Sequence, residues 1–178
     1  FRREWFDTWR DAYRPGAIGM VRHWDLAATE PSPEAKDPDY TVGTRLHALP
    51  NGEYDVVDVV RGQWSSAKAE AQILATARAD GRLVTIGIEQ EPGSAGKKVV
   101  EDFQNRVLRG YAVQGVRPTG SKFTRAGPVA SAAERGKLAV IRGAWTAPWL
   151  NELSLFRDSS PGRPDHGHDD QVDSLSGA

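Results

Sequence analysis

Hydrophobic and polar positions alternate along residues 40–49, and the runs at 17–27 and 53–61 on either side are also strand-like. Alternation of this kind is typical of strands that bury one face. The sequence Pro-Asn-Gly at 50–52 joins the second run to the third and is typical of a tight hairpin turn. Because no helical pattern separates the three runs, they predict an antiparallel meander.

After residue 62, helical patterns alternate with short apolar strands. The predicted elements are a helix from Ser65 or Ser66 to about 79, a strand at 83–88, a helix at 95–109, a strand at 111–116, a helix at 122–135, a short strand at 137–141, a helix at 146–156 and a last helix starting near Asp169. Strands connected through helices run parallel. The pattern therefore predicts an α/β fold with a mixed five-stranded sheet, three antiparallel strands then parallel strands, flanked by helices.

The first 16 residues differ from the rest. Four aromatic side chains stand at helical spacing within residues 1–14, and Pro-Gly follows at 15–16. We predict a short helix or linker over 1–16 and one folded domain over 17–178, a length that suits a single domain. Since the chain has no initiator Met, we expect it to be part of a longer soluble intracellular protein.

Composition removes several classes of site. The chain has no cysteine, which excludes disulfides, thiolate zinc sites, iron–sulfur clusters and cysteine nucleophiles. No apolar run approaches the roughly 18 residues of a membrane span, so no membrane partner is expected.

Charge is distributed unevenly, although the net charge is only −1. Residues 97–142 hold ten Lys and Arg against three acidic residues, whereas the segments on either side are acidic overall. A basic middle between acidic flanks predicts a phosphate-binding surface beside a carboxylate site. A solvated basic face fits the charge pattern equally well.

Acidic residues stand where predicted elements begin or end. Asp25 ends the first strand, Glu89 ends the fourth, and Asp169 and Asp170 open the last helix. If the first and fourth strands are neighbours, Asp25 and Glu89 lie side by side, and the helix adds a third carboxylate. Each acid also has a plain structural reading, as a turn residue, an exposed side chain or a helix N-cap.

A cluster of carboxylates indicates a divalent cation, because the charges repel and lose hydration when they are brought together. Oxygen ligands alone favour Mg²⁺ or Mn²⁺ over zinc. Two such ions about 4 Å apart can activate a water and stabilise the leaving oxygen in phosphodiester hydrolysis.

Two further motifs are weaker. The sequence GSAGKK at 93–98 lacks the spacing of a nucleotide-binding P-loop, but it brings Lys97 close to Glu89, where it can meet a DNA phosphate. His166-x-His168-x-Asp170 is similar to a zinc hydrolase pattern whose final His is replaced here by Gln171. We therefore do not predict zinc; His168 is either a plain loop histidine or an acid–base or supporting group at an oxygen-ligand site.

Several runs together resemble one family. They are HWDLA at 23–27, DYT at 39–41, VDVVRGQW at 57–64, IEQEPGSAG at 88–96, Lys122 with RAGP at 125–128, and HDDQVDSL at 168–175. In this order they resemble the C-terminal nuclease domain of terminase large subunits from tailed phages or prophages. The resemblance extends from about residue 17 to the end, and its closing HDDQVD run is the most specific part.

The resemblance implies an RNase H-like fold and a metal-dependent DNA endonuclease that cuts concatemeric viral DNA, with two Mg²⁺ or Mn²⁺ ions. Asp25 matches the first ligand and Glu89 the second, where other members carry Asp. Asp169 or Asp170 matches the third; we favour Asp170 as the direct ligand, and Asp173, one turn later, can also face the site.

Other implied features concern partners. Lys97, Lys122 and Arg125 are expected to hold the DNA backbone. The expected partners are double-stranded viral DNA, the portal protein and the small terminase subunit, in the cytoplasm of the bacterial host. Residues 1–16 would then follow an ATPase domain.

Two alternatives remain open at this point. One is a Holliday-junction resolvase or transposase-like nuclease of the same superfold, which the fold alone does not exclude. The other is a module that docks on DNA or the portal and cuts only together with the motor domain.

Overall fold

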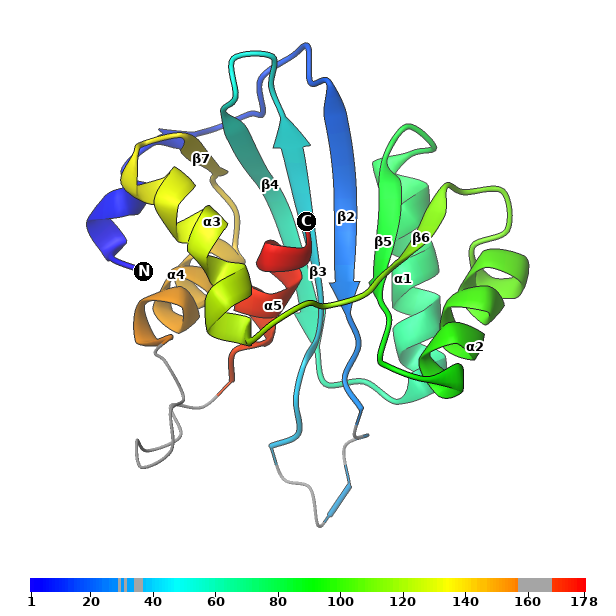
Figure 1. Cartoon of the computed structure of the whole chain (residues 1–178). Coiled ribbons are helices and arrows are strands. Elements are labelled where there is room, and N and C mark those ends of the chain that lie inside the picture. The colour runs from blue at the N-terminus through cyan, green and yellow to red at the C-terminus, as the bar shows by residue number, and fades with distance from the viewer. Residues whose placement is uncertain (29, 31, 34–36, 157–167) are drawn as a thin grey trace.

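A seven-stranded mixed sheet forms the centre of the fold, with helices on both faces (Figure 1). The computed structural model describes residues 1–28, 30, 32–33, 37–156 and 168–178. The strands are β1 (Trp9–Arg10), β2 (Gly19–Asp25), β3 (Thr41–Ala48), β4 (Tyr54–Gly62), β5 (Thr85–Glu89), β6 (Val113–Val116) and β7 (Leu138–Ile141). Their order across the sheet is β1-β7-β4-β3-β2-β5-β6.

The helices are α1 (Ser66–Asp80), α2 (Ser94–Asp102) with a π-helical turn at Phe103–Val107, α3 (Lys122–Glu134), α4 (Thr146–Leu155) and α5 (Asp170–Gly177). In Figure 1, α3, α4 and α5 lie on one side of the sheet, and α1 and α2 lie toward the β5–β6 end. No helix in the described ranges is long and apolar enough to cross a membrane.

The predicted mixed sheet is confirmed, and it has more strands than expected. β2, β3 and β4 form the antiparallel meander, and β5 and β6 run parallel to β2. The short strand predicted at 137–141 forms as β7 and joins the sheet, parallel to β4. Its residues are buried throughout, which is why a run of four apolar positions without alternation is still a sheet strand.

The helix predicted over residues 1–14 is wrong. Arg3–Phe6 forms one 3-10 turn, and β1 then pairs with β7 at the edge of the sheet. Phe6 is 1% exposed and packs edge-on against Trp149. The aromatic spacing therefore reflects side chains that anchor this segment on the α4 side of the domain.

Two hydrophobic cores stabilise the two faces. One is built around Trp149, Leu153 and Leu175 under α3, α4 and α5. The other is built around Trp24, Ile73 and Phe103 under α1 and α2. Burial of this apolar surface fixes the strands whose ends carry the acidic residues.

Candidate functional site

The ends of β2 and β5 bring Asp25 and Glu89 together. The two strands are parallel neighbours, with Trp24 opposite Ile88. Asp25 and Glu89 each follow that pair by one residue, so they lie side by side at the same edge of the sheet.

Helix α5 contributes carboxylates from across the strand ends. Ser174 fixes it there: its hydroxyl donates to the His23 carbonyl oxygen at 2.9 Å and accepts from the Thr44 amide at 3.0 Å. Asp170 and Asp173 are three residues apart and therefore lie on one face of the helix. Both are buried, 6% and 4% exposed.

The electrostatics of Asp25 reflect its burial and the acids around it. Burial raises the pKa of Asp25 to about 8, with further contributions from Glu89, Asp173 and Asp170 in that order. A carboxyl group in such surroundings gives up its proton at neutral pH only with a nearby cation.

Two basic side chains from α3 lie among these acids. The Lys122 ammonium is 2.6 Å from carboxylate oxygens of both Asp169 and Asp173, and the Arg125 guanidinium is 2.7 Å from Asp173. These ion pairs raise the pKa of Lys122 although burial opposes the charge. Burial raises the pKa of Asp173, with Lys122 and Arg125 opposing. Lys122 thus supplies one internal positive charge to the cluster.

His23 lies beside Glu89. The two residues share a face of the sheet with Asp25, because side chains two apart on a strand point the same way. The His23 Nε2 is 4.0 Å from a Glu89 carboxylate oxygen, and neither ring nitrogen has a hydrogen-bond partner within the described structure. The His23 ring lowers the pKa of Glu89 against the effect of its partial burial.

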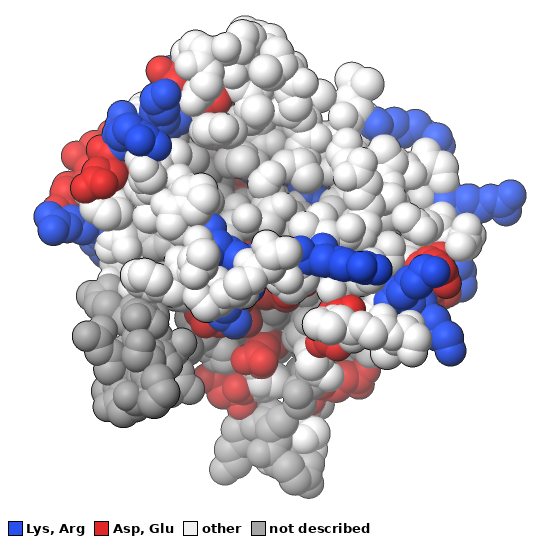
Figure 2. All heavy atoms as spheres, in the orientation of Figure 1, with Lys and Arg blue, Asp and Glu red and all other residues white. Residues whose placement is uncertain are grey.

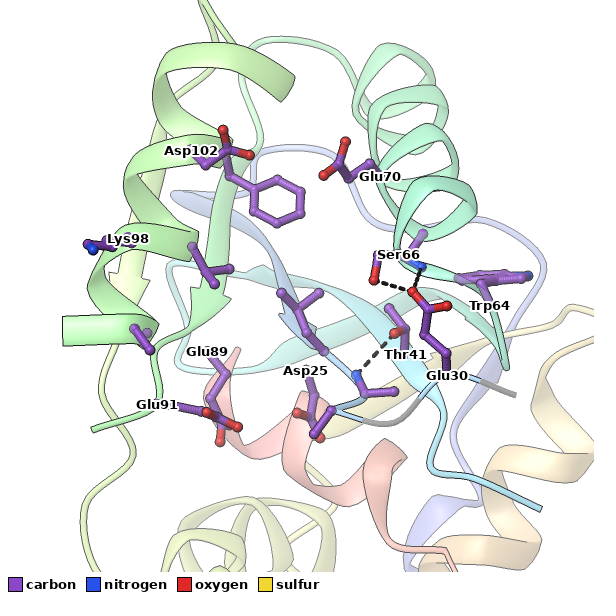
Figure 3. A pocket seen from close by; sticks show the side chains of 18 residues that line it. Asp25, Glu30, Thr41, Trp64, Ser66, Glu70, Glu89, Glu91, Lys98 and Asp102 are labelled. Atoms are coloured by element: carbon purple, nitrogen blue, oxygen red, sulfur yellow. Dashed lines mark hydrogen bonds between the residues drawn. The ribbon is translucent and has the colours of Figure 1, made fainter. Parts of the chain in front are cut away.

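A cavity of about 560 Å³ opens from the Asp25–Glu89 edge between α1 and α2. Figure 3 shows Asp25, Glu89 and Glu91 at one end and Glu70 and Asp102 at the other. Arg106 pairs with Glu70 at 2.7 Å and with Asp102 at 2.5 Å, which compensates part of the negative charge at the outer end. The negative charge is therefore concentrated at the strand ends.

His168 forms a smaller group with Asp37, Asp39 and Asp170. Its Nε2 is 3.0 Å from Asp37, and its Nδ1 is 3.5 Å from Asp170 and 3.8 Å from Asp39. These carboxylates raise the pKa of His168 although partial burial opposes the shift. Asp39, His168 and Asp170 offer ligand atoms within 4.8 Å of one another.

The predicted site residues do not all lie in one cluster. The structure brings Asp25, Glu89, Asp170 and Asp173 together, whereas the Asp169 side chain is 34% exposed and pairs with Lys122. Lys97 is exposed and pairs with Glu101 at 3.6 Å, while its neighbour Lys98 lines the cavity. His166 of the zinc-like pattern lies outside the described residues.

Sequence reasoning did not single out His23, Asp39 or Glu91 as part of the site. The signal for His23 was its alternation with Asp25 on one strand. Asp39 and Glu91 are loop residues whose approach to the cluster depends on tertiary folding.

The donor set fits a hard divalent cation. Asp25, Glu89, Asp170 and Asp173 offer carboxylate oxygens, the ligands that Mg²⁺ and Mn²⁺ prefer. The raised pKa of Asp25 indicates that these acids lack sufficient compensating charge in the protein alone.

Several known proteins are similar to this chain. A family model described as the terminase RNaseH-like domain matches residues 22–178. No curated protein sequence matches the chain significantly. Among solved structures, the large terminase nuclease of thermophilic phage G20c with bound magnesium is 19% identical, with 93% of this chain and 82% of that chain covered and a TM-score of 0.65.

Two further structures are similar. The G20c nuclease with bound zinc is 17% identical over 98% of this chain and 92% of that chain, with a TM-score of 0.61. The human cytomegalovirus terminase nuclease domain, soaked with manganese and bound to an inhibitor, is 11% identical over 98% and 90%, with a TM-score of 0.67. At these identities the likeness establishes a shared fold.

Proposed function

The chain belongs to the family of terminase RNase H-like domains, and from this premise we propose that it is the metal-dependent DNA endonuclease of a viral genome-packaging motor. Its substrate is double-stranded viral DNA, which it cuts by hydrolysis of phosphodiester bonds. The portal protein and the small terminase subunit are its partners in the motor, which works in the cytoplasm of the bacterial host.

We assign the ion site to the acids at the β2 and β5 ends and on α5. Asp25, Glu89 and Asp173 hold Mg²⁺ or Mn²⁺, with Asp170 beside them. Bound ions, two in the proposed reaction, supply an activated water and neutralise charge on the leaving oxygen. Lys122 and Arg125 hold Asp173 in position before the ions bind.

The observation that carries this proposal is the environment of Asp25. Its carboxyl is buried beside Glu89, Asp173 and Asp170, which raises its pKa to about 8. A protein stabilises such a group for catalysis by binding a cation, whereas a purely structural acid at this position would be paired with a cationic side chain.

The charge of the surrounding surface supports a DNA substrate. Figure 2 shows basic side chains across the front, where the segment between β6 and α3 crosses the sheet, and acidic side chains directly below them. Basic groups next to the acids can bind the phosphates of DNA while the acids bind the ions.

We predict that the purified domain nicks and linearises supercoiled plasmid with Mg²⁺ or Mn²⁺ and leaves it intact with EDTA. The measurement is agarose-gel cleavage over a series of ion concentrations, with a linear duplex and a four-way junction as parallel substrates.

Cleavage of the linear duplex supports the packaging nuclease, whereas cleavage confined to the junction contradicts it in favour of a resolvase. DNA binding without cleavage at any ion concentration contradicts an autonomous nuclease and favours a docking module that needs the motor domain.

A further inference from the structure

A second, smaller cavity of about 220 Å³ lies next to the carboxylate cluster. It is bounded by residues 116–119, which follow β6, by Arg125 on α3, and by Ser176 and Gly177 in the last turn of α5. The sites that enclose a drug-sized molecule measure roughly 300–1,000 Å³. This cavity is smaller than such sites and has room for a group the size of a phosphate.

Positive charge lines one side of this cavity. The Arg117 side chain is exposed and, within the described residues, has no hydrogen-bond or ion-pair partner. Arg125 is held between the Gly120 carbonyl oxygen at 3.3 Å and Asp173 at 2.7 Å. Arg117 is therefore available to a ligand, and Arg125 is held in place beside it. Two guanidinium groups at one cavity suit an oxyanion such as a phosphate.

The floor of the cavity is a buried imidazole. His23 is fully buried and lines the cavity, and both of its ring nitrogens lack a hydrogen-bond partner in the described structure. Two glycines make room for the ring: a Cβ at Gly87 would come within 2.9 Å of Nδ1, and a Cβ at Gly177 would overlap the ring. A buried polar group without a partner costs stability, which an occupant able to hydrogen-bond would recover.

Glu89 connects this cavity to the reaction. Its side chain lines both the 220 Å³ cavity and the 560 Å³ cavity at the ion site. A group held here is therefore next to the bond that is cut. The Glu89 charge opposes an anion until a divalent ion neutralises it, so binding of the ion and of the anion should strengthen each other.

We propose that this cavity binds one backbone phosphate of the DNA strand, adjacent to the phosphate that is cleaved, with Arg117 and Arg125 as its ligands. The inference rests on the proposed function and specifies how the substrate strand is positioned. Because the contact is to phosphate, it fixes the register of the strand without reading its sequence.

The test compares Arg117→Gln with Arg109→Gln. Arg109 is also exposed in the basic segment, but it does not line either cavity. Binding of a fluorescent duplex in Ca²⁺ is measured over a range of salt concentrations, with the duplex checked for integrity. Arg117→Gln should weaken binding about tenfold and reduce the slope of log K against log salt by about 0.9. Arg109→Gln should cause neither this loss of affinity nor this change in the salt slope.

A second measurement locates the phosphate. In duplexes carrying one neutral methylphosphonate, wild-type cleavage should be blocked at two positions, the cut phosphate and its neighbour in the cavity. Arg117→Gln should still be blocked at the cut phosphate and should be less sensitive than the wild type at the neighbouring position, where Arg125 remains. Equal affinity, slope and blocking pattern in wild type and Arg117→Gln would overturn the subsite.

The proposed function and the phosphate subsite can be refuted independently of each other. If the wild type cuts no DNA with any ion, the proposed function fails, while the binding comparison still decides the subsite. If the wild type cuts and Arg117→Gln behaves as Arg109→Gln does, only the subsite fails.

Discussion

Asp25→Asn is expected to reduce metal-dependent DNA cleavage by a factor on the order of 10³ or more, while the domain stays folded. Asp25 lies at the centre of the acidic cluster, and Asn has nearly the same shape but no charge to offer an ion. The measurement is the cleavage rate in Mg²⁺ and in Mn²⁺ beside the wild type, with circular dichroism to check folding. Cleavage at the wild-type rate would remove Asp25 from the ion site.

The same variant should change how stability depends on pH in EDTA. The pKa of Asp25 is about 8 in the folded domain and about 3.8 in the unfolded chain. Between these values folding takes up a proton, so this group's contribution is fully present below about pH 4. It is lost as the pH rises through about 8, by up to roughly 1.4 kcal/mol per pH unit.

Urea unfolding of both proteins between about pH 5 and pH 8 isolates this contribution, because Asp170, Asp173 and Glu152 titrate in both. The free energy of unfolding of the wild type should fall relative to that of Asp25→Asn as the pH rises. Parallel curves would show that the Asp25 carboxyl is not buried among like charges.

Asp173→Asn is expected to lose cleavage nearly as completely as Asp25→Asn, whereas Asp169→Asn should keep most of it. Both carboxylates pair with Lys122, but the Asp173 carboxyl is 4% exposed and contributes to the raised pKa of Asp25, whereas the Asp169 carboxyl is 34% exposed. Both substitutions remove one negative charge at the N-terminal end of α5, Asp169 just before the helix and Asp173 within it, so each is the control for the other. Cleavage rates at saturating Mn²⁺ are the measurement.

The opposite ranking, with Asp169→Asn inactive and Asp173→Asn active, would contradict this assignment. It would also agree better with the sequence-based expectation that the adjacent acids Asp169 and Asp170 provide the third ligand. Equal and partial losses in both variants would contradict it as well, because they would indicate a general effect of charge on DNA binding.

Local sequence patterns were sufficient for much of the fold. The alternation within residues 40–49, the turn at 50–52 and the run at 53–61 predicted β3 and β4, and the apolar run before Glu89 predicted β5. We expected Asp25 and Glu89 to lie side by side if the first and fourth predicted strands were neighbours. These strands are β2 and β5, and they do pair in the sheet. The roles of these residues stay predictions.

Features that depend on contacts between residues far apart in the sequence were harder to predict. The aromatic residues before Pro15 have helical spacing, yet Phe6 packs on Trp149 and β1 pairs with β7, partners more than 100 residues away. The pairing of Lys122 with Asp169 and Asp173 links α3 to α5. The sequence analysis assigned this lysine to the DNA backbone and did not predict the pairing, since neither helix specifies its neighbour.

A crystal soaked in Mn²⁺ and measured for anomalous scattering shows directly whether the acids at the β2 and β5 ends form a divalent-ion site. This assignment predicts an anomalous peak between the carboxylates of Asp25 and Glu89 and within reach of Asp173. Peaks only at the group of Asp39, His168 and Asp170, or no peak beside Asp25 at saturating Mn²⁺, would contradict it.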